Sequence, residues 1–350
     1  MPEPASHAAH RPLRTGVLLV NLGTPDAPQP REVRRYLREF LSDPRVIDLP
    51  APARRLLLEL VILPFRPRAS ARAYAKIWTP GGSPLLVHSR ALRAAVAREL
   101  GPEYTVALGM RYGRPSLREA AQELAAADVA RVLALPLFPQ YSEAATGSAV
   151  AKLREELARA DAPPVEVLAP FYAEPRFVAA FAALARPRFA AFRPDHVLFS
   201  YHGLPERQVR ASDATGAHCL ARASCCDAIG PANARCYRAH CFATSRALAA
   251  ALSLPTERCT TAFQSRLGRT PWITPFTDHA LPALAARGVR RLAVLCPSFV
   301  ADCLETLEEI GLRARERWTA LGGEALDLVP CPNAEPAWAR TIAEWIRERA

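Results

Sequence analysis

A histidine stands at the end of an apolar run in the second half of the chain. His202 lies in the pentapeptide 200–204 (Ser-Tyr-His-Gly-Leu), directly after the strand-like stretch 195–199. Ligands bind at strand ends in open α/β sheets, and imidazole is both a common metal ligand and a base that works near pH 7. His202 is therefore the first candidate for chemistry. The alternative is a histidine that only satisfies a turn by hydrogen bonding.

A row of carboxylates forms the second candidate site. The apolar run 292–296 leads into a segment with Asp302, Glu305 and Glu309. Their spacing of three and four predicts one shared helical face, close to the N-terminus of a helix. Such residues often only complement the helix dipole. Together with an imidazole, however, carboxylate oxygens suit Fe(II), Zn(II) or Co(II), and the same groups move protons.

A dense group of cysteines forms the third constellation. The chain has nine cysteines, and five of them fall within residues 214–241. A disulfide framework is not expected, because we find no secretory signal and the cytosol keeps thiols reduced. Thiolate ligands of a structural zinc or of an iron–sulfur cluster fit better, with unliganded thiols as the alternative. The five residues are Cys219, Cys225, Cys226, Cys236 and Cys241.

Composition indicates a globular enzyme of ordinary type. At 350 residues, 50% hydrophobic and 23% charged, the chain can bury a large core and is expected to form two domains. It has no apolar run of membrane-spanning length, and its first fifteen residues lack the apolar stretch of a secretory signal. We therefore expect a soluble cytoplasmic protein.

The positive net charge does not indicate a nucleic-acid partner. The charge is +11, but arginines alternate with glutamates along helical stretches such as 31–38 and 313–317. This pattern is typical of a solvated helix face. We expect no nucleic acid, and we take the charge as weak support for an anionic ligand or a membrane surface.

Alternating strand and helix patterns predict the fold class. Apolar strand-like runs recur along the chain with helical stretches between them, which favours α/β architecture with two doubly wound, Rossmann-like domains, each a parallel sheet flanked by helices. We expect the first domain over 15–169 and the second over 170–330, with the cysteine segment 214–241 inside it. Residues 331–350 form a helix that packs back on the first domain. No G-x-G-x-x-G follows a strand, so a dinucleotide site is unsupported. The predicted strands are 15–21, 106–110, 129–136, 165–168, 196–200, 260–264, 292–296 and 326–330.

Ordered motifs over nearly the whole chain resemble those of the ferrochelatases, enzymes that insert ferrous iron into a porphyrin to make haem. They lie at 21–25, 109–112, 138–142, 146–148, 200–205, 263–266, 271–272 and 302–307. The resemblance implies that His202 and Glu305 are the active-site pair and iron ligands. It implies that Asp302 and Glu309 continue an acidic path as a proton relay. The residues implied to line the porphyrin cleft are Arg111, Tyr112, Tyr141, Ser142 and Trp272.

The resemblance also implies a cofactor and a substrate. Certain bacterial members hold a 2Fe-2S cluster through internal cysteines, which favours Cys219, Cys226, Cys236 and Cys241 here, with Cys225 as the alternate for Cys226. Leu22 stands where coproporphyrin-using members have tyrosine, so we expect protoporphyrin IX rather than coproporphyrin III.

Other functions stay open from the sequence. They are a cobalt or nickel chelatase acting on a related tetrapyrrole, and a non-enzymatic iron–sulfur redox or iron-sensing protein in which His202 is structural. Ferrous iron and protoporphyrin IX are the expected partners, with a membrane surface as a candidate peripheral contact. The sequence does not indicate the oligomeric state, or whether His202 accepts protons or delivers iron.

Overall fold

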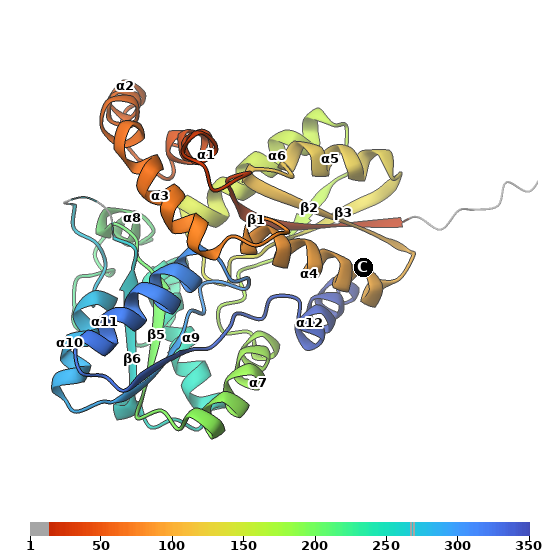
Figure 1. Cartoon of the computed structure of the whole chain (residues 1–350). Coiled ribbons are helices and arrows are strands. Elements are labelled where there is room, and N and C mark those ends of the chain that lie inside the picture. Colours follow the sequence, from red (N-terminus) through yellow and green to blue (C-terminus); the bar gives the residue numbers. More distant parts are fainter. Residues whose placement is uncertain (1–13, 267, 269) are drawn as a thin grey trace, which may run out of the picture.

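The computed structural model describes residues 14–266, 268 and 270–350. The prediction about a secretory signal concerns mainly residues 1–13, which lie outside these ranges. Within the described ranges the strands form two four-stranded sheets, and every strand pair is parallel. Helices flank both sheets (Figure 1). The predicted α/β class with two parallel sheets is therefore confirmed.

The first sheet has the strand order β2-β1-β3-β4. Its central strand β1 contains the unbroken apolar run 17–20, whose side chains are fully buried. A strand covered by helices on both faces has this composition, because neither face meets water. Gly23, near the end of β1, has a φ of +116°, and a Cβ there would lie 1.7 Å from the carbonyl oxygen of Tyr112. Only glycine permits this close approach of β1 to β2. The strands are β1 (Arg14–Thr24), β2 (Tyr104–Gly113), β3 (Val129–Pro136) and β4 (Val165–Val167).

The second sheet repeats this pattern with the order β6-β5-β7-β8. Its central strand β5 is buried from His196 to Tyr201, and it ends at His202. In the register of β5 with β6, His202 pairs with Gln264, so the two strands end at the same level. Side chains at the carboxyl ends of both strands therefore open onto one edge of the sheet. The strands are β5 (His196–His202), β6 (Cys259–Gln264), β7 (Arg291–Leu295) and β8 (Ala325–Leu328).

The helices include three with π-type hydrogen bonding. One of them, η2, continues directly into the α-helix α6. The helices before β5 are α1 (Pro30–Ser42), α2 (Ala51–Leu56), η1 (Leu57–Ile62), α3 (Leu63–Ile77), α4 (Pro84–Leu100), α5 (Leu117–Ala126), η2 (Glu143–Gly147), α6 (Ser148–Arg159) and α7 (Pro175–Phe192). After β5 come α8 (Glu206–Ala211), η3 (Ala223–Cys226), η4 (Pro231–Asn233), α9 (Tyr237–Ala251), η5 (Thr256–Arg258), α10 (Thr277–Ala286), η6 (Glu305–Ala314), α11 (Arg315–Ala320) and α12 (Pro336–Arg347).

The C-terminal helix α12 contacts both halves of the chain. It packs against α4 from the first half and α7 from the second, and Figure 1 shows it lying beneath α4. Trp338 and Trp345 on this helix are buried with Phe171 between the two halves. An amphipathic helix with one large apolar face is expected at such a junction.

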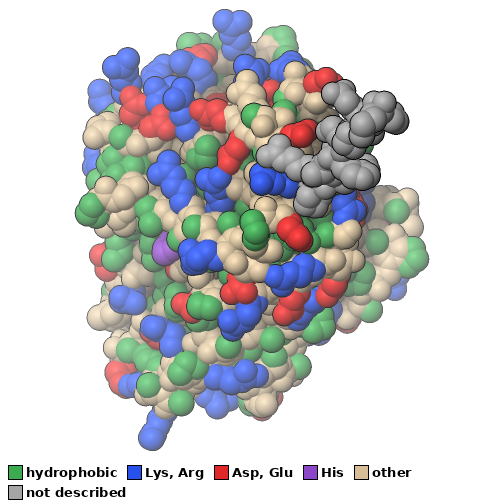
Figure 2. All heavy atoms as spheres, turned by 90° about the vertical axis from the view of Figure 1, so that its right-hand side faces the viewer, with side chains coloured by type: hydrophobic (Ala, Val, Ile, Leu, Met, Phe, Trp, Pro, Cys, Tyr) green, Lys and Arg blue, Asp and Glu red, His purple; other side chains and the backbone are tan. Residues whose placement is uncertain are grey.

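On one face of the molecule, positive and negative side chains are interspersed (Figure 2). Figure 2 shows Lys and Arg side chains beside Asp and Glu side chains over the face it presents. No helix in the described part of the chain is long and apolar enough to cross a membrane.

Candidate active site

A cavity of about 570 Å³ lies at the carboxyl ends of both sheets. Its wall combines apolar side chains with polar ones, among them His202, Glu305 and Glu309. Cavities of this size and composition are usual for small organic ligands. Apolar residues of the wall include Leu22, Leu37, Phe40, Leu85, Leu137, Phe138, Phe263 and Ile310.

His202 is held firmly by its neighbours. Its backbone N–H donates to Ser298 Oγ at 3.2 Å, in the loop that follows β7. Its Nδ1 lies 2.7 Å from the carbonyl oxygen of Gly203. Because a carbonyl only accepts, Nδ1 carries the hydrogen, and the lone pair of Nε2 remains available for a metal or a proton.

Glu305 and Glu309 both reach the cavity from η6. The amide of Gln264 donates to the backbone oxygen of Glu305 at 2.7 Å, and Ser265 Oγ donates to Glu309 Oε2 at 2.5 Å. Burial raises the pKa of Glu309, and the negative charge of Glu305 raises it further. Glu309 therefore holds a proton to higher pH than an ordinary glutamic acid does.

Asp302 does not share this helical face, so that prediction is wrong. The residue precedes the helix, is buried, and is not among the described residues that line the cavity. Its carboxylate accepts hydrogen bonds from Thr306 Oγ1 at 2.9 Å and Asn333 Nδ2 at 2.8 Å. Thr306 and Asn333 thus tie Asp302 to η6 and to the segment after β8, which holds the start of η6 in place.

Of the residues expected to line the porphyrin cleft, some line the cavity and others lie outside the described part of its wall. Leu22 and Ser142 line the cavity, as expected for a cleft wall. Trp272 instead lies next to the imidazole of His202, with ring centroids 6.5 Å apart, and is not among the described lining residues.

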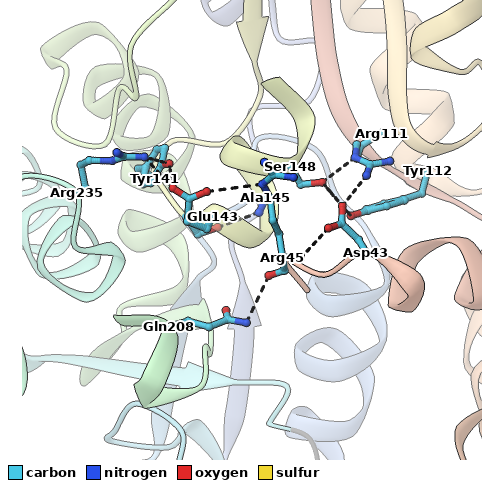
Figure 3. Close-up of polar contacts among 11 residues, drawn as sticks. Asp43, Arg45, Arg111, Tyr112, Tyr141, Glu143, Ala145, Ser148, Gln208 and Arg235 are labelled. Carbon is cyan, nitrogen blue, oxygen red and sulfur yellow. Dashed lines mark hydrogen bonds and ion pairs between the residues drawn. The ribbon is translucent and has the colours of Figure 1, made fainter. Parts of the chain in front are cut away.

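Arg111 and Tyr112 are also outside the described cavity wall. Tyr112 is fully buried, and its hydroxyl lies 3.0 Å from Asp43 Oδ2 (Figure 3). Arg111 donates to the same carboxylate at 2.5 Å and to Ser148 Oγ at 2.7 Å. Burial opposes ionisation of Asp43, but the bonds from Ser148, Arg45 N–H and Tyr112 and the charge of Arg111 lower its pKa overall. These contacts join Arg111 and Tyr112 of β2 to Asp43 and Ser148 within the first half of the chain.

Tyr141 likewise points toward a neighbour outside the described wall. Its hydroxyl donates to Glu143, and its ring lies 4.4 Å below the guanidinium of Arg235. Figure 3 shows Arg235 reaching Tyr141 from the cysteine segment. The polar contacts of Tyr141 therefore join the two halves of the chain beside the cavity.

Among the described cavity residues that the sequence does not predict, Arg66 is the one with an unpaired buried polar atom. Arg66 of α3 lines the cavity, and its Nη1 is buried without a hydrogen-bond partner among the described residues. Burial lowers the pKa of Arg66, while the charges of Glu309 and Glu305 act in the opposite direction. An unpaired buried guanidinium nitrogen suits an anionic group of a ligand. The stretch around Arg66 contains several arginines, and nothing in their types or spacing sets this one apart.

All five cysteines of the segment 214–241 are buried and free of disulfides. The sulfurs of Cys225 and Cys226 are 3.7 Å apart, and Arg238 Nη1 donates to Cys226 Sγ at 3.1 Å. A hydrogen bond with Cys236, and burial, raise the pKa of Cys226. Buried soft donors with an adjacent cation suit the ligation of an anionic iron–sulfur cluster. Among the described residues, no three His, Cys, Asp or Glu side chains are arranged to hold a single metal ion.

Fold comparison defines the class of protein. The chain is similar to the structure titled "SirB from Bacillus subtilis with Fe3+", with a TM-score of 0.52 and 10% identity, over 97% of this chain and 96% of that one. The sirohydrochlorin chelatase SirB from Bacillus subtilis subspecies spizizenii, in complex with cobalt, gives a TM-score of 0.51, also at 10% identity, over the same shares of the two chains. At this identity the likeness concerns the fold alone, which is the chelatase-type α/β fold.

Sequence comparison defines the family. The ferrochelatase family model matches residues 14–350. A ferrochelatase of Coxiella burnetii (strain CbuK_Q154) is 49% identical over 335 residues, 96% of this chain and 94% of that protein. A ferrochelatase of Legionella pneumophila (strain Lens) is 49% identical over 340 residues, 96% of this chain and all of that protein. The chain belongs to the ferrochelatase family, and it is a metal chelatase of the lyase class.

Proposed function

We propose that the protein inserts Fe(II) into protoporphyrin IX within the cavity between residues 15–169 and residues 170–330, which we take as two domains. The observation that carries this proposal is that His202, Glu305 and Glu309 line one cavity together with many apolar side chains. Two pyrrole N–H bonds break and iron–nitrogen bonds form, so two protons leave for each iron inserted. An imidazole and a carboxylate hold Fe(II) without enclosing it, which favours its transfer.

Cations of the cavity suit the carboxylates of the porphyrin. Arg66, Arg266, Arg313 and Arg317 all contribute to its lining. Arg313 already contacts Glu309 at 3.3 Å, whereas the buried Nη1 of Arg66 has no described partner. We propose that Arg66 binds a propionate, and that the macrocycle lies against the apolar wall near Leu22.

Protoporphyrin IX is the substrate that we expect this wall to favour. Leu22 offers an apolar surface to its vinyl groups, whereas coproporphyrin III carries charged propionates at the corresponding positions. We expect kcat/KM for protoporphyrin IX to exceed that for coproporphyrin III by about tenfold or more, the scale of one lost apolar contact. Haem formation from both porphyrins, measured by absorbance under anaerobic conditions, tests this. A clear preference for coproporphyrin III would overturn the assignment.

The cysteine segment is proposed to bind a 2Fe-2S cluster through Cys219, Cys226, Cys236 and Cys241, with Cys225 as the alternate for Cys226. The support is the burial of all five thiols and the guanidinium of Arg238 against the sulfurs. We expect anaerobically purified protein to show charge-transfer absorption and acid-labile sulfide, and the Cys236→Ser protein to lose both. Cys259 lies outside the segment, so Cys259→Ser is the matched control and keeps both signals. Colourless protein with stoichiometric zinc would contradict the assignment.

We propose that the protein is cytoplasmic and that it contacts a membrane surface peripherally. The contact would be made by an exposed apolar patch at the end of α2 and on η1 and α3. Leu60 and Phe65 are 64% and 75% exposed, and Leu56 and Val61 are exposed beside them. Arginines 54, 55 and 68 flank this patch, which is the composition of helices that lie on anionic membranes.

Vesicle flotation tests this surface. We expect the protein to float with vesicles of phosphatidylglycerol and phosphatidylcholine, and the double variant Leu60→Ser, Phe65→Ser to lose most of that binding. Leu321 is exposed at the end of α11, away from the patch, so Leu321→Ser is the matched control. Equal flotation of all three proteins would exclude the patch as the contact.

A further inference from the structure

The hydroxyl of Tyr237 holds the backbone of His202. Tyr237 Oη donates to the carbonyl oxygen of His202 at 2.8 Å. The ring of Tyr237 is largely buried and lines the cavity. Ser298 completes this arrangement, because its Oγ accepts the N–H of His202 at 3.2 Å. Side chains from outside the strand pair thus hold both backbone polar groups of His202. Ser298 holds the N–H, and Tyr237 holds the carbonyl oxygen.

Tyr237 also belongs to the cysteine segment. It is the first residue of α9, and the N-cap of that helix is Cys236. Cys241 lies one turn further along the same helix, and it is fully buried. A change in how Cys236 is bound therefore acts on the next residue of the chain, Tyr237, which holds His202.

The neighbours of Tyr237 tie the same helical turn to other parts of the cavity rim. Arg235 reaches Glu143 at 2.8 Å and lies over the ring of Tyr141 (Figure 3). Arg238 connects Cys226 Sγ, at 3.1 Å, to the carbonyl oxygen of Thr274, at 3.3 Å, two residues after Trp272. These contacts fix the start of α9 to the segments around Glu143, Cys226 and Thr274.

We propose that Tyr237 is a positioning residue for His202 and that the ligation state of the cysteine segment, through Cys236, sets this position. The inference rests on the proposed function of His202 and of the cysteines. In this arrangement the cysteine segment takes no part in metal insertion. It fixes where the imidazole stands, and loss of its ligation displaces the imidazole through a single hydrogen bond.

The variant Tyr237→Phe tests the first step, since it removes only the hydroxyl. We expect kcat for metal insertion to fall about tenfold, the scale of one hydrogen bond, with KM for the porphyrin changed less than twofold. In ¹H–¹⁵N spectra of the histidine rings, the signals of His202 move while those of His88 and His196 stay. Tyr201→Phe is the matched control, because Tyr201 is buried on β5 but bonds Ser245 instead, at 2.9 Å.

The second step is tested by Cys236→Ser alone and combined with Tyr237→Phe. We expect Cys236→Ser to move the His202 ring signals, and to move them no further once the tyrosine hydroxyl is absent. Cys226→Ser replaces Cys236→Ser if that protein does not fold. Unchanged His202 signals in Tyr237→Phe would refute the positioning role, and equal shifts by the cysteine variant with and without the hydroxyl would refute the coupling. The spectra are recorded without substrate, so failure here is distinct from failure of the proposed chelatase function, which His202→Ala tests.

Discussion

Replacing His202 by alanine is expected to lower the rate of iron insertion by about 10²- to 10⁴-fold, the range over which a positioned acid–base or ligand group acts. The available Nε2 lone pair is lost, and no other imidazole among the described residues lines the cavity. Anaerobic haem formation at saturating porphyrin measures the effect. His196 lies at the opposite end of the same strand and bonds Thr260, at 2.8 Å, so His196→Ala is the matched control. That variant should keep its turnover per folded molecule.

The same variant separates the two roles open to His202. If the imidazole delivers iron, His202→Ala weakens the binding of Fe(II) to porphyrin-free protein, as measured by calorimetry. If it accepts pyrrole protons, metal binding is kept and only turnover falls. A turnover within about twofold of the unaltered protein would remove His202 from the chemistry altogether.

Glu305→Gln is expected to lower turnover about 100-fold or more while the affinity for porphyrin changes less than about twofold, the pattern of a group that acts on the metal rather than on the macrocycle. The amide keeps the shape of the side chain but loses the negative charge that attracts Fe(II). Fluorescence quenching of protoporphyrin measures binding, and haem absorbance measures turnover. Glu316→Gln, on the exposed side of α11, is the matched control.

Loss of the Glu305 charge has a second consequence, with a definite sign. That charge raises the pKa of Glu309, so its removal lets the pKa of Glu309 fall toward the ordinary value. A titration of the Glu309 carboxyl carbon by ¹³C NMR should therefore move to lower pH in Glu305→Gln. If the titration of Glu309 stays at the same pH and turnover stays normal, the two glutamates do not act in one site.

The strand ends and the ordered motifs can be predicted from the sequence because they depend on neighbouring residues. The apolar run before His202 predicts β5, and the register with β6 brings Gln264 to the same edge. Spacing alone places Asp302 on the helical face of Glu305 and Glu309, because it assumes that the helix already includes residue 302. Its carboxylate instead bonds Asn333, a partner from a distant segment that spacing does not reveal.

Side chains of the cleft wall were harder to predict for the same reason. Arg111 and Tyr112 bond Asp43 and Ser148 in the fold, and their sequence context does not reveal these contacts with distant segments. Arg66, in contrast, looks like an ordinary surface arginine until burial leaves its Nη1 unpaired. Tertiary partners decide which polar groups remain available to a ligand.

One anaerobic absorption time course tests most directly whether this protein joins Fe(II) to protoporphyrin IX. Purified protein is mixed with ferrous iron and protoporphyrin IX, in parallel with the His202→Ala protein. We expect haem bands to replace the porphyrin bands within the assay with the unaltered protein, and to stay at the uncatalysed rate with the variant. Equal haem formation in both samples, or turnover of sirohydrochlorin in place of protoporphyrin, would contradict the account.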